Sequence, residues 1–264
     1  SCDSFLNQPP YDDFTDEEYW QNEDQARTYM YGFYTSIFSG YGTGTSHGPF
    51  LMGQTLNDDF ASDAEQKDLT PLVVPEADGS WSFSNIRKAN YALASIDRID
   101  ATPAVKNHWR GVARFFRACY YSNLVFRYGD VPWYDRVPRL SDSKEDMDYL
   151  YKDRDPRAFV DSCIMADFQY AMDSVRENDG PQQINRYVVA AMVSRFMLRE
   201  GTFLKYHNID AHLAEQCLTM AKDAAEMVMK SNKYAIAPSY NALFTSEDLG
   251  SNPEIIMHRH YVDG

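Results

Sequence analysis

A long aromatic-rich segment between residues 103 and 128 constrains the fold more than any other part of the sequence. Thr102 can cap a helix here, and Pro103 suits its first position, where a missing N–H costs nothing. The run stops at a Gly-Asp-Val-Pro turn at positions 129–132. At about 1.5 Å per residue, the helix would span roughly 37 Å and must cross a large core. Apolar side chains follow helical spacing at Val105, Trp109, Val112, Phe116, Tyr120 and Leu124.

Composition supports a large folded core and argues against nucleic acid as a partner. The chain has 264 residues, of which 44% are hydrophobic, enough to fill such a core. It carries 25 Lys and Arg against 39 Asp and Glu, a formal net charge of −14. Neutralising phosphates requires a basic surface, so nucleic acid is not expected to bind. No apolar run approaches the roughly 20 residues that a membrane-spanning helix needs.

Start signals and apolar spacing predict further helices. Asn22, with Gln25 three residues on, predicts a helix that ends near Phe38. Helical spacing predicts a second helix over residues 86–96, and Pro156 opens another. The inward face of the helix after Pro156 is expected to carry Phe159, Cys163, Ala166 and Tyr170.

Residues 186–200 and 211–230 are expected to form an antiparallel helical hairpin. Asn185 and Asp210 can cap these two helices, and Gly201 stands where a C-terminal glycine cap belongs. The hairpin is similar to a tetratricopeptide unit, and no strand-turn-strand rhythm occurs in the sequence. The fold class is therefore predicted to be mainly α, a tetratricopeptide-like helical scaffold with long irregular loops. Small residues that would let the two backbones approach are Ala190, Ala191, Gly201, Ala221 and Ala225.

The irregular segment over residues 39–82 is the candidate ligand region. A stretch this long without periodicity in a compact domain is usually functional or disordered. Asp58 and Asp59 could accept hydrogen bonds from sugar hydroxyls, hold a cation, act in catalysis, or simply form a solvated acidic loop. Trp81 could stack on the apolar face of a sugar or plug the core where the next helix begins.

No catalytic or metal-binding motif is present, so no cofactor and no metal are expected. The six His are scattered, and no H-E-x-x-H spacing or phosphate-binding loop occurs. Cys119, Cys163 and Cys217 lie on apolar helix faces and are predicted to be small core residues. Cys2 lies at the start of the chain, where it is either a lipid-modified residue left after signal-peptide removal or accidental.

Six segments in order along the chain resemble the SusD/RagB-like family of outer-membrane nutrient-binding lipoproteins. The most specific is the arginine-rich helix that ends in Tyr-Gly-Asp-Val-Pro. Where the family usually has Glu before Ala-Arg, this sequence has Val112. Family members are generally about twice this long, so residues 1–264 resemble the N-terminal helical half. The segments are "SCDSFLNQPP", "EEYWQNEDQARTYMYGFY", "WSFSNIRKANYALASID", "GVARFFRACYYSNLVFRYGDVPW", "INRYVVAAMVSRFMLREGTFLKYH" and "YNALFTSEDLGSNPEIIMHRHY".

The resemblance implies a non-enzymatic lipoprotein on the cell surface. It would be tethered to the outer membrane through Cys2 and seated on a SusC-like TonB-dependent transporter barrel. It would capture oligosaccharides and deliver them to that barrel without bond chemistry. By position within the family pattern, Asp58, Asp59 and Trp81 would contact the glycan.

Three other functions stay open at the level of sequence. The same scaffold could carry oligopeptides, because some relatives do and nothing in the residues excludes it. A helical glycoside hydrolase could use the loop acids. A structural helical-repeat adaptor would bind no small ligand at all.

Overall fold

The computed structural model of the chain describes residues 19–38, 79–138 and 143–260. These ranges hold no β-strand, only an isolated bridge between Val131 and Asp155. The prediction of a mainly α fold is therefore confirmed. The regular elements are α2 (Glu23–Ile37), α4 (Ser84–Ser95), the 3-10 turn η3 (Ile96–Arg98), α5 (Pro103–Tyr128), α6 (Lys144–Leu150), α7 (Arg157–Ser174), α8 (Arg186–Tyr206), α9 (Ala211–Lys230) and α10 (Tyr240–Thr245).

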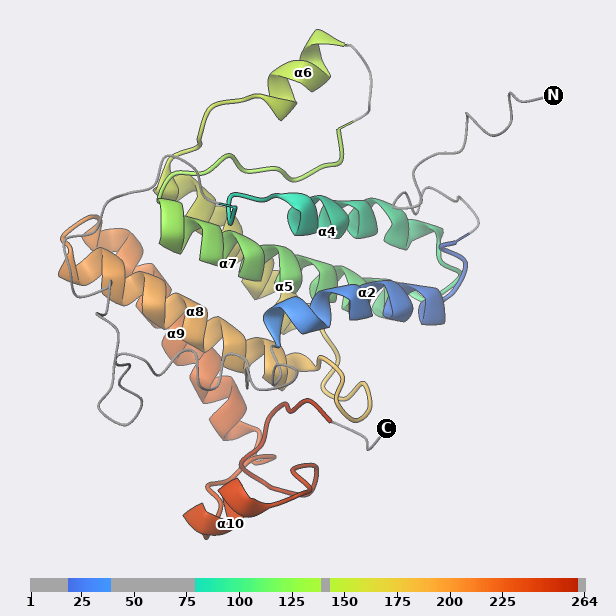
Figure 1. Cartoon of the computed structure of the whole chain (residues 1–264), viewed down its shortest axis with the longest axis vertical. Coiled ribbons are helices and arrows are strands. Elements are labelled where there is room, and N and C mark those ends of the chain that lie inside the picture. The colour runs from blue at the N-terminus through green and yellow to red at the C-terminus, as the bar shows by residue number, and fades with distance from the viewer. Residues whose placement is uncertain (1–18, 39–78, 139–142, 261–264) are drawn as a thin grey trace, which may run out of the picture.

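Helix α5 is the centre of the bundle (Figure 1). It packs most extensively against α7 and α4, and it also contacts α2 and α8. Helices α8 and α9 form the expected hairpin, which has the largest helix–helix contact among the described elements. In Figure 1, α6 stands away from the bundle at one end, and α10 lies at the opposite end. None of the described helices combines the length and apolar character that a bilayer crossing requires.

Four predicted helix starts are confirmed by capping hydrogen bonds. The Asn22 side chain accepts from the backbone N–H of Gln25 at 3.1 Å, and the Gln25 side chain accepts from the N–H of Asn22 in return. Thr102, Asn185 and Asp210 likewise cap α5, α8 and α9. Such caps satisfy backbone donors within a few residues of the same chain, which is why sequence alone finds them.

Two short helices were not predicted by the apolar pattern. Ser143 caps α6 and Ser239 caps α10, and each helix makes two turns or fewer. Segments this short do not repeat an apolar position often enough to show a period.

The Gly-Asp-Val-Pro turn redirects the chain after α5. Gly129 has φ of 72°, in the left-handed region that favours glycine, and its N–H bonds the carbonyl of Val125 at 2.8 Å. Val131 then pairs with Asp155, whose carboxylate accepts the N–H of Trp133 at 2.7 Å. The turn therefore holds the segment before α7 against the end of α5.

The predicted inward face of α7 is wrong at Phe159 and Ala166, whereas Cys163 does pack against the core. Phe159 is 48% exposed and Ala166 is also exposed, whereas Asp161 and Asp167 are buried. The apolar pattern assigns carboxylates to the solvent side, but here arginines lie beside both of them. The residues of α7 that face the core are Val160, Asp161, Ile164, Asp167, Phe168, Ala171 and Met172.

Gly201 does not end α8, contrary to the prediction of a glycine cap. The helix continues to Tyr206, and Gly201 lies inside it against α9. A Cβ at this position would lie 2.7 Å from Leu218 Cγ and 3.1 Å from the Ala214 carbonyl oxygen. Glycine is therefore needed for the close approach of α8 and α9, which the small-residue pattern did predict.

Candidate functional site

The structure describes one of the predicted ligand-binding residues, Trp81. Asp58, Asp59 and the predicted lipidation residue Cys2 lie outside the described residues, as does most of the predicted loop region. The site is therefore built outward from Trp81, which precedes α4 by three residues.

The Trp81 ring is held by neighbours and is still open to solvent. It meets Phe83 and Tyr128 edge to face, with ring centroids 5.3 Å and 4.9 Å away. The guanidinium carbon of Arg154 lies 4.8 Å from the ring centroid, a cation–π distance. The residue nevertheless keeps 37% of its surface exposed. The ring thus has a fixed orientation at the surface and is not a core plug.

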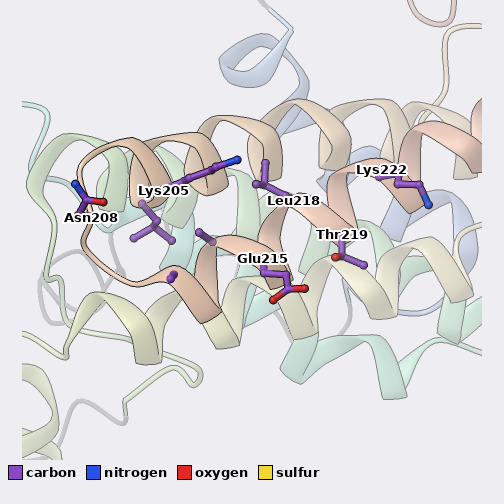
Figure 2. Close-up of a pocket in the computed structure, with 9 residues that line it drawn as sticks. Lys205, Asn208, Glu215, Leu218, Thr219 and Lys222 are labelled. Carbon is purple, nitrogen blue, oxygen red and sulfur yellow. The ribbon is translucent and has the colours of Figure 1, made fainter.

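A cavity of about 600 Å³ lies elsewhere, along the α8–α9 hairpin (Figure 2). Lys205, Glu215 and Lys222 are among its lining residues. Figure 2 shows these side chains spread along the groove rather than converging on one point. A ligand site needs a few polar groups that converge, so this groove is a weaker candidate than the region of Trp81.

A second cavity, of about 530 Å³, lies beside Trp81 between the start of α4 and the end of α5. The chain neighbours of Trp81, Ser80 and Ser82, line it, and so does its ring partner Tyr128. The described part of its wall combines polar and aromatic side chains and includes no carboxylate. The described lining residues are Ser80, Ser82, Ser84, Asn85, Tyr120, Asn123, Leu124, Phe126, Arg127 and Tyr128.

A third cavity, of about 300 Å³, lies on the other side of the same segment, between α4 and the chain after α5. Phe83, which contacts Trp81, and Ser84, which also faces the 530 Å³ cavity, contribute to it. It is more apolar than the 530 Å³ cavity, and no carboxylate is among its described lining residues either. The described lining residues are Phe83, Ser84, Ile86, Arg87, Asn90, Tyr134, Arg136, Pro138 and Leu150.

Hydrogen-bonding side chains in the larger of these two cavities are oriented by neighbouring side chains. The Asn123 side-chain oxygen accepts two bonds from Arg199, both 3.2 Å, so its amide NH₂ is left to donate elsewhere. Tyr120 shares a short hydrogen bond with Ser36, and burial raises the pKa of Tyr120 to about 12. The phenol therefore stays neutral near pH 7. The wall offers uncharged hydroxyl and amide groups that suit a hydroxyl-rich ligand.

Metal binding and nucleophilic catalysis find no support in the described part of the chain. No group of three or more His, Cys, Asp or Glu side chains comes together there in a way that could hold a metal. Cys119 and Cys217 are buried, as predicted, and burial raises the pKa of both thiols. A thiol with a raised pKa is a poor nucleophile near pH 7.

Sequence reasoning identified Trp81 but missed Arg154, which lies over its ring, and Arg127, which lines the neighbouring cavity. Arg154 is 73 positions away along the chain and belongs to a segment with no helical pattern. Arg127 lies in the last turn of the long helix, where the sequence pattern indicates a solvated basic residue near a helix C-terminus. Only the turn after α5 brings Arg154 to the side of Trp81.

No family model and no curated protein sequence matches the chain. Solved structures do match. A SusD-like protein from Bacteroides fragilis aligns with a TM-score of 0.66 and 20% identity, over 96% of this chain and 48% of that one. A SusD-like carbohydrate binding protein from the same species aligns with a TM-score of 0.63 and 18% identity, over 92% of this chain and 47% of that one. B. fragilis NanU aligns with a TM-score of 0.62 and 17% identity, over 95% of this chain and 50% of that one.

Identity at this level establishes the fold and not the activity. The resemblance predicted from the sequence motifs is confirmed at that level, because the aligned region includes nearly all of this chain. The chain also spans about half the length of the structures that it matches. It therefore has the SusD-like helical fold, over about half of the length found in those proteins.

Proposed function

We propose that the protein captures oligosaccharides at the cell surface without cleaving them and delivers them to a SusC-like TonB-dependent outer-membrane transporter. The observation that carries this proposal is the exposed, fixed ring of Trp81 beside a polar cavity, on a SusD-like fold. A SusD-like protein of the same fold is described as carbohydrate binding.

The chemistry of the region suits a sugar. A pyranose ring has one face of C–H groups that packs against an aromatic ring, while its hydroxyls need donors and acceptors nearby. Trp81 supplies the ring, and Ser80, Ser82 and Asn123 supply polar groups in the adjoining wall. We propose that Asp58 and Asp59 add acceptors for hydroxyl groups. Hydrolysis would need two carboxyl groups across the scissile bond, and the described walls of the two cavities beside Trp81 contain none.

Membrane attachment is proposed through lipidation of Cys2. Stable anchoring takes more than one acyl chain or a second contact, and a transporter partner would supply that contact. The test is metabolic labelling with a fatty-acid analogue in the producing cell. Label in the wild-type protein and none in Cys2→Ser supports the anchor; equal label in both would refute it.

Glycan binding is tested by calorimetry with a panel of surface oligosaccharides. Trp81→Ala is expected to weaken binding about tenfold or more, because the stacking face is removed. Tyr206→Ala is the matched control, since Tyr206 is 74% exposed and lines none of the three cavities. Equal affinity of the wild type and Trp81→Ala would remove Trp81 from the site. Release of reducing ends during incubation would overturn the non-catalytic function.

A further inference from the structure

Asn123 lies on the face of α5 that borders the 530 Å³ cavity, and a residue of another helix holds its side chain. Tyr120, Asn123 and Arg127 are spaced by three and four positions, so they share this face of the helix. The Asn123 oxygen accepts from both Nη1 and Nη2 of Arg199 on α8, each at 3.2 Å. Asn123 is itself exposed, so its carboxamide is within reach of a ligand.

Arg199 is fixed by contacts on several sides. Its guanidinium carbon lies 4.2 Å from the centre of the Phe126 ring and 5.1 Å from the centre of the Phe196 ring. Its Nη2 also donates to the carbonyl of Ser122 at 2.9 Å. Two cation–π contacts and a backbone hydrogen bond leave the guanidinium little freedom, so its donors meet Asn123 in a fixed direction.

The pairing with Arg199 decides the orientation of the Asn123 carboxamide. A guanidinium has donors only, whereas a carboxamide has an oxygen that accepts and an NH₂ group that donates. The oxygen must therefore turn toward Arg199, and the NH₂ group is directed away from it. Within the described part of the chain, that NH₂ group donates to no protein atom. The cavity wall thus carries a donor whose orientation is set before any ligand arrives.

We propose that Asn123 determines specificity in this cavity by donating to an acceptor oxygen of the saccharide, and that Arg199 is the positioning residue that fixes this polarity. The inference rests on the proposed function, because it names a contact within the same glycan site. A hydroxyl, ring or acetamido oxygen accepts such a bond, whereas an ammonium group in the same place has no lone pair and is rejected. This donor is compatible with the acceptors proposed above, since a sugar hydroxyl both accepts and donates.

The experiment uses an array of neutral tetrasaccharides built from glucose, galactose, mannose or xylose. Each is present with a set of analogues in which one hydroxyl at a time is replaced by hydrogen or by an amino group. Binding is measured at about pH 6, where the amines are charged. For the wild type, we expect one position at which loss of the hydroxyl weakens binding about three- to tenfold, and at which the amine binds more weakly still.

Two substitutions of Asn123 test the donor itself. In Asn123→Leu, loss of the hydroxyl at that position should no longer change the affinity, because its donor is gone. In Asn123→Asp, Arg199 still holds one oxygen and the other accepts, so the preference should reverse in favour of the amine. Asn107→Asp is the matched control. Asn107 is exposed on the same helix roughly 24 Å away, and its side-chain oxygen also accepts from an arginine, Arg110.

Substitutions of Arg199 test its positioning role. Arg199→Gln can both donate and accept, so it no longer fixes the carboxamide and should reduce the preference for the hydroxyl over the amine. Arg199→Lys has donors only and should keep that preference. A purely structural role of Arg199 would change all affinities together and leave the preference unchanged.

The outcomes separate this inference from the proposed function. Glycan binding in which no position depends on Asn123, or a preference that Asn123→Asp leaves unchanged, overturns the inference and leaves glycan capture intact. Binding of nothing on the array overturns both. Circular dichroism of each variant verifies folding, and the variants at the exposed Asn123 test the inference even if Arg199→Gln fails to fold.

Discussion

Arg117 on α5 and Asp167 on α7 form a two-point ion pair inside the helical bundle. The Nε–Oδ2 distance is 2.7 Å and the Nη2–Oδ1 distance is 2.9 Å, and both residues are buried. The remaining Nη1 donates to the side-chain oxygen of Asn90 on α4 at 2.7 Å. The pair thus links three helices and keeps its donors satisfied.

Removing one charge of this pair is expected to destabilise the fold strongly. Asp167→Asn leaves the buried Arg117 charge uncompensated, which typically costs about 3–5 kcal/mol in the free energy of unfolding. Urea denaturation measures the change. Asp173→Asn is the control, because Asp173 lies exposed on the same helix, and its change should stay within about 0.5 kcal/mol. Equal losses in the two variants would contradict the role of the pair.

Asp161 is expected to make stability depend on pH. Burial, followed by the charge of Glu200, raises the pKa of Asp161 to about 8, while Arg157 acts in the opposite direction. Arg157 pairs with Glu200 at 2.6 Å and lies only 3.9 Å from Asp161, and neither Asp161 oxygen has a hydrogen-bond partner among the described residues. Cys217 on α9 also faces this group.

The direction of this pH dependence follows from the raised pKa of Asp161. The folded state holds a proton on Asp161 that the unfolded state releases at lower pH, so this contribution is complete below about pH 4 and is lost as pH rises toward about 8. The slope is at most about 1.4 kcal/mol per pH unit. Asp161→Asn should be less sensitive than the wild type between about pH 5 and about pH 8. Burial lowers the pKa of His108, so this residue also makes stability depend on pH. Its contribution is the same in both proteins and cancels when their stabilities are subtracted. Parallel curves would refute this prediction.

Gly201→Ala is expected to destabilise the α8–α9 hairpin by about 1–3 kcal/mol, because the added methyl overlaps the Leu218 side chain. Gly32→Ala is the matched control. Gly32 lies inside α2 with no atom within 4 Å of the added methyl, so alanine there should stabilise by about 0.5–1 kcal/mol. Thermal unfolding of both variants measures the two opposite signs. Stabilisation by both changes would show that α9 yields to the new methyl.

Fluorescence quenching should report on Trp81 alone among the four tryptophans. Trp81 is 37% exposed, whereas Trp20, Trp109 and Trp133 are 8% exposed or less. Iodide should quench emission more strongly than caesium, because Arg154 attracts the anion. Most of this quenching should vanish in Trp81→Phe, and the preference for iodide should fall in Arg154→Gln. A preference for caesium in the wild type would contradict a positive local potential.

Local sequence determined where helices α2, α5, α8 and α9 begin. Asn22, Thr102, Asn185 and Asp210 each accept a backbone N–H two or three residues ahead, so the whole interaction lies within one short segment. The class of fold followed from the same local patterns. The order of the motifs along the chain also pointed to the SusD-like scaffold that the solved structures share.

Only the tertiary structure decided which charges are buried and what surrounds Trp81. Asp167 is 50 positions from Arg117, and Arg154 is 73 positions from Trp81. Hydropathy assigns Arg117 and Asp167 to solvent, since a buried charge is costly unless it is paired. The partner that offsets this cost comes from another helix or turn, so its position depends on how the helices pack and not on the residues beside it.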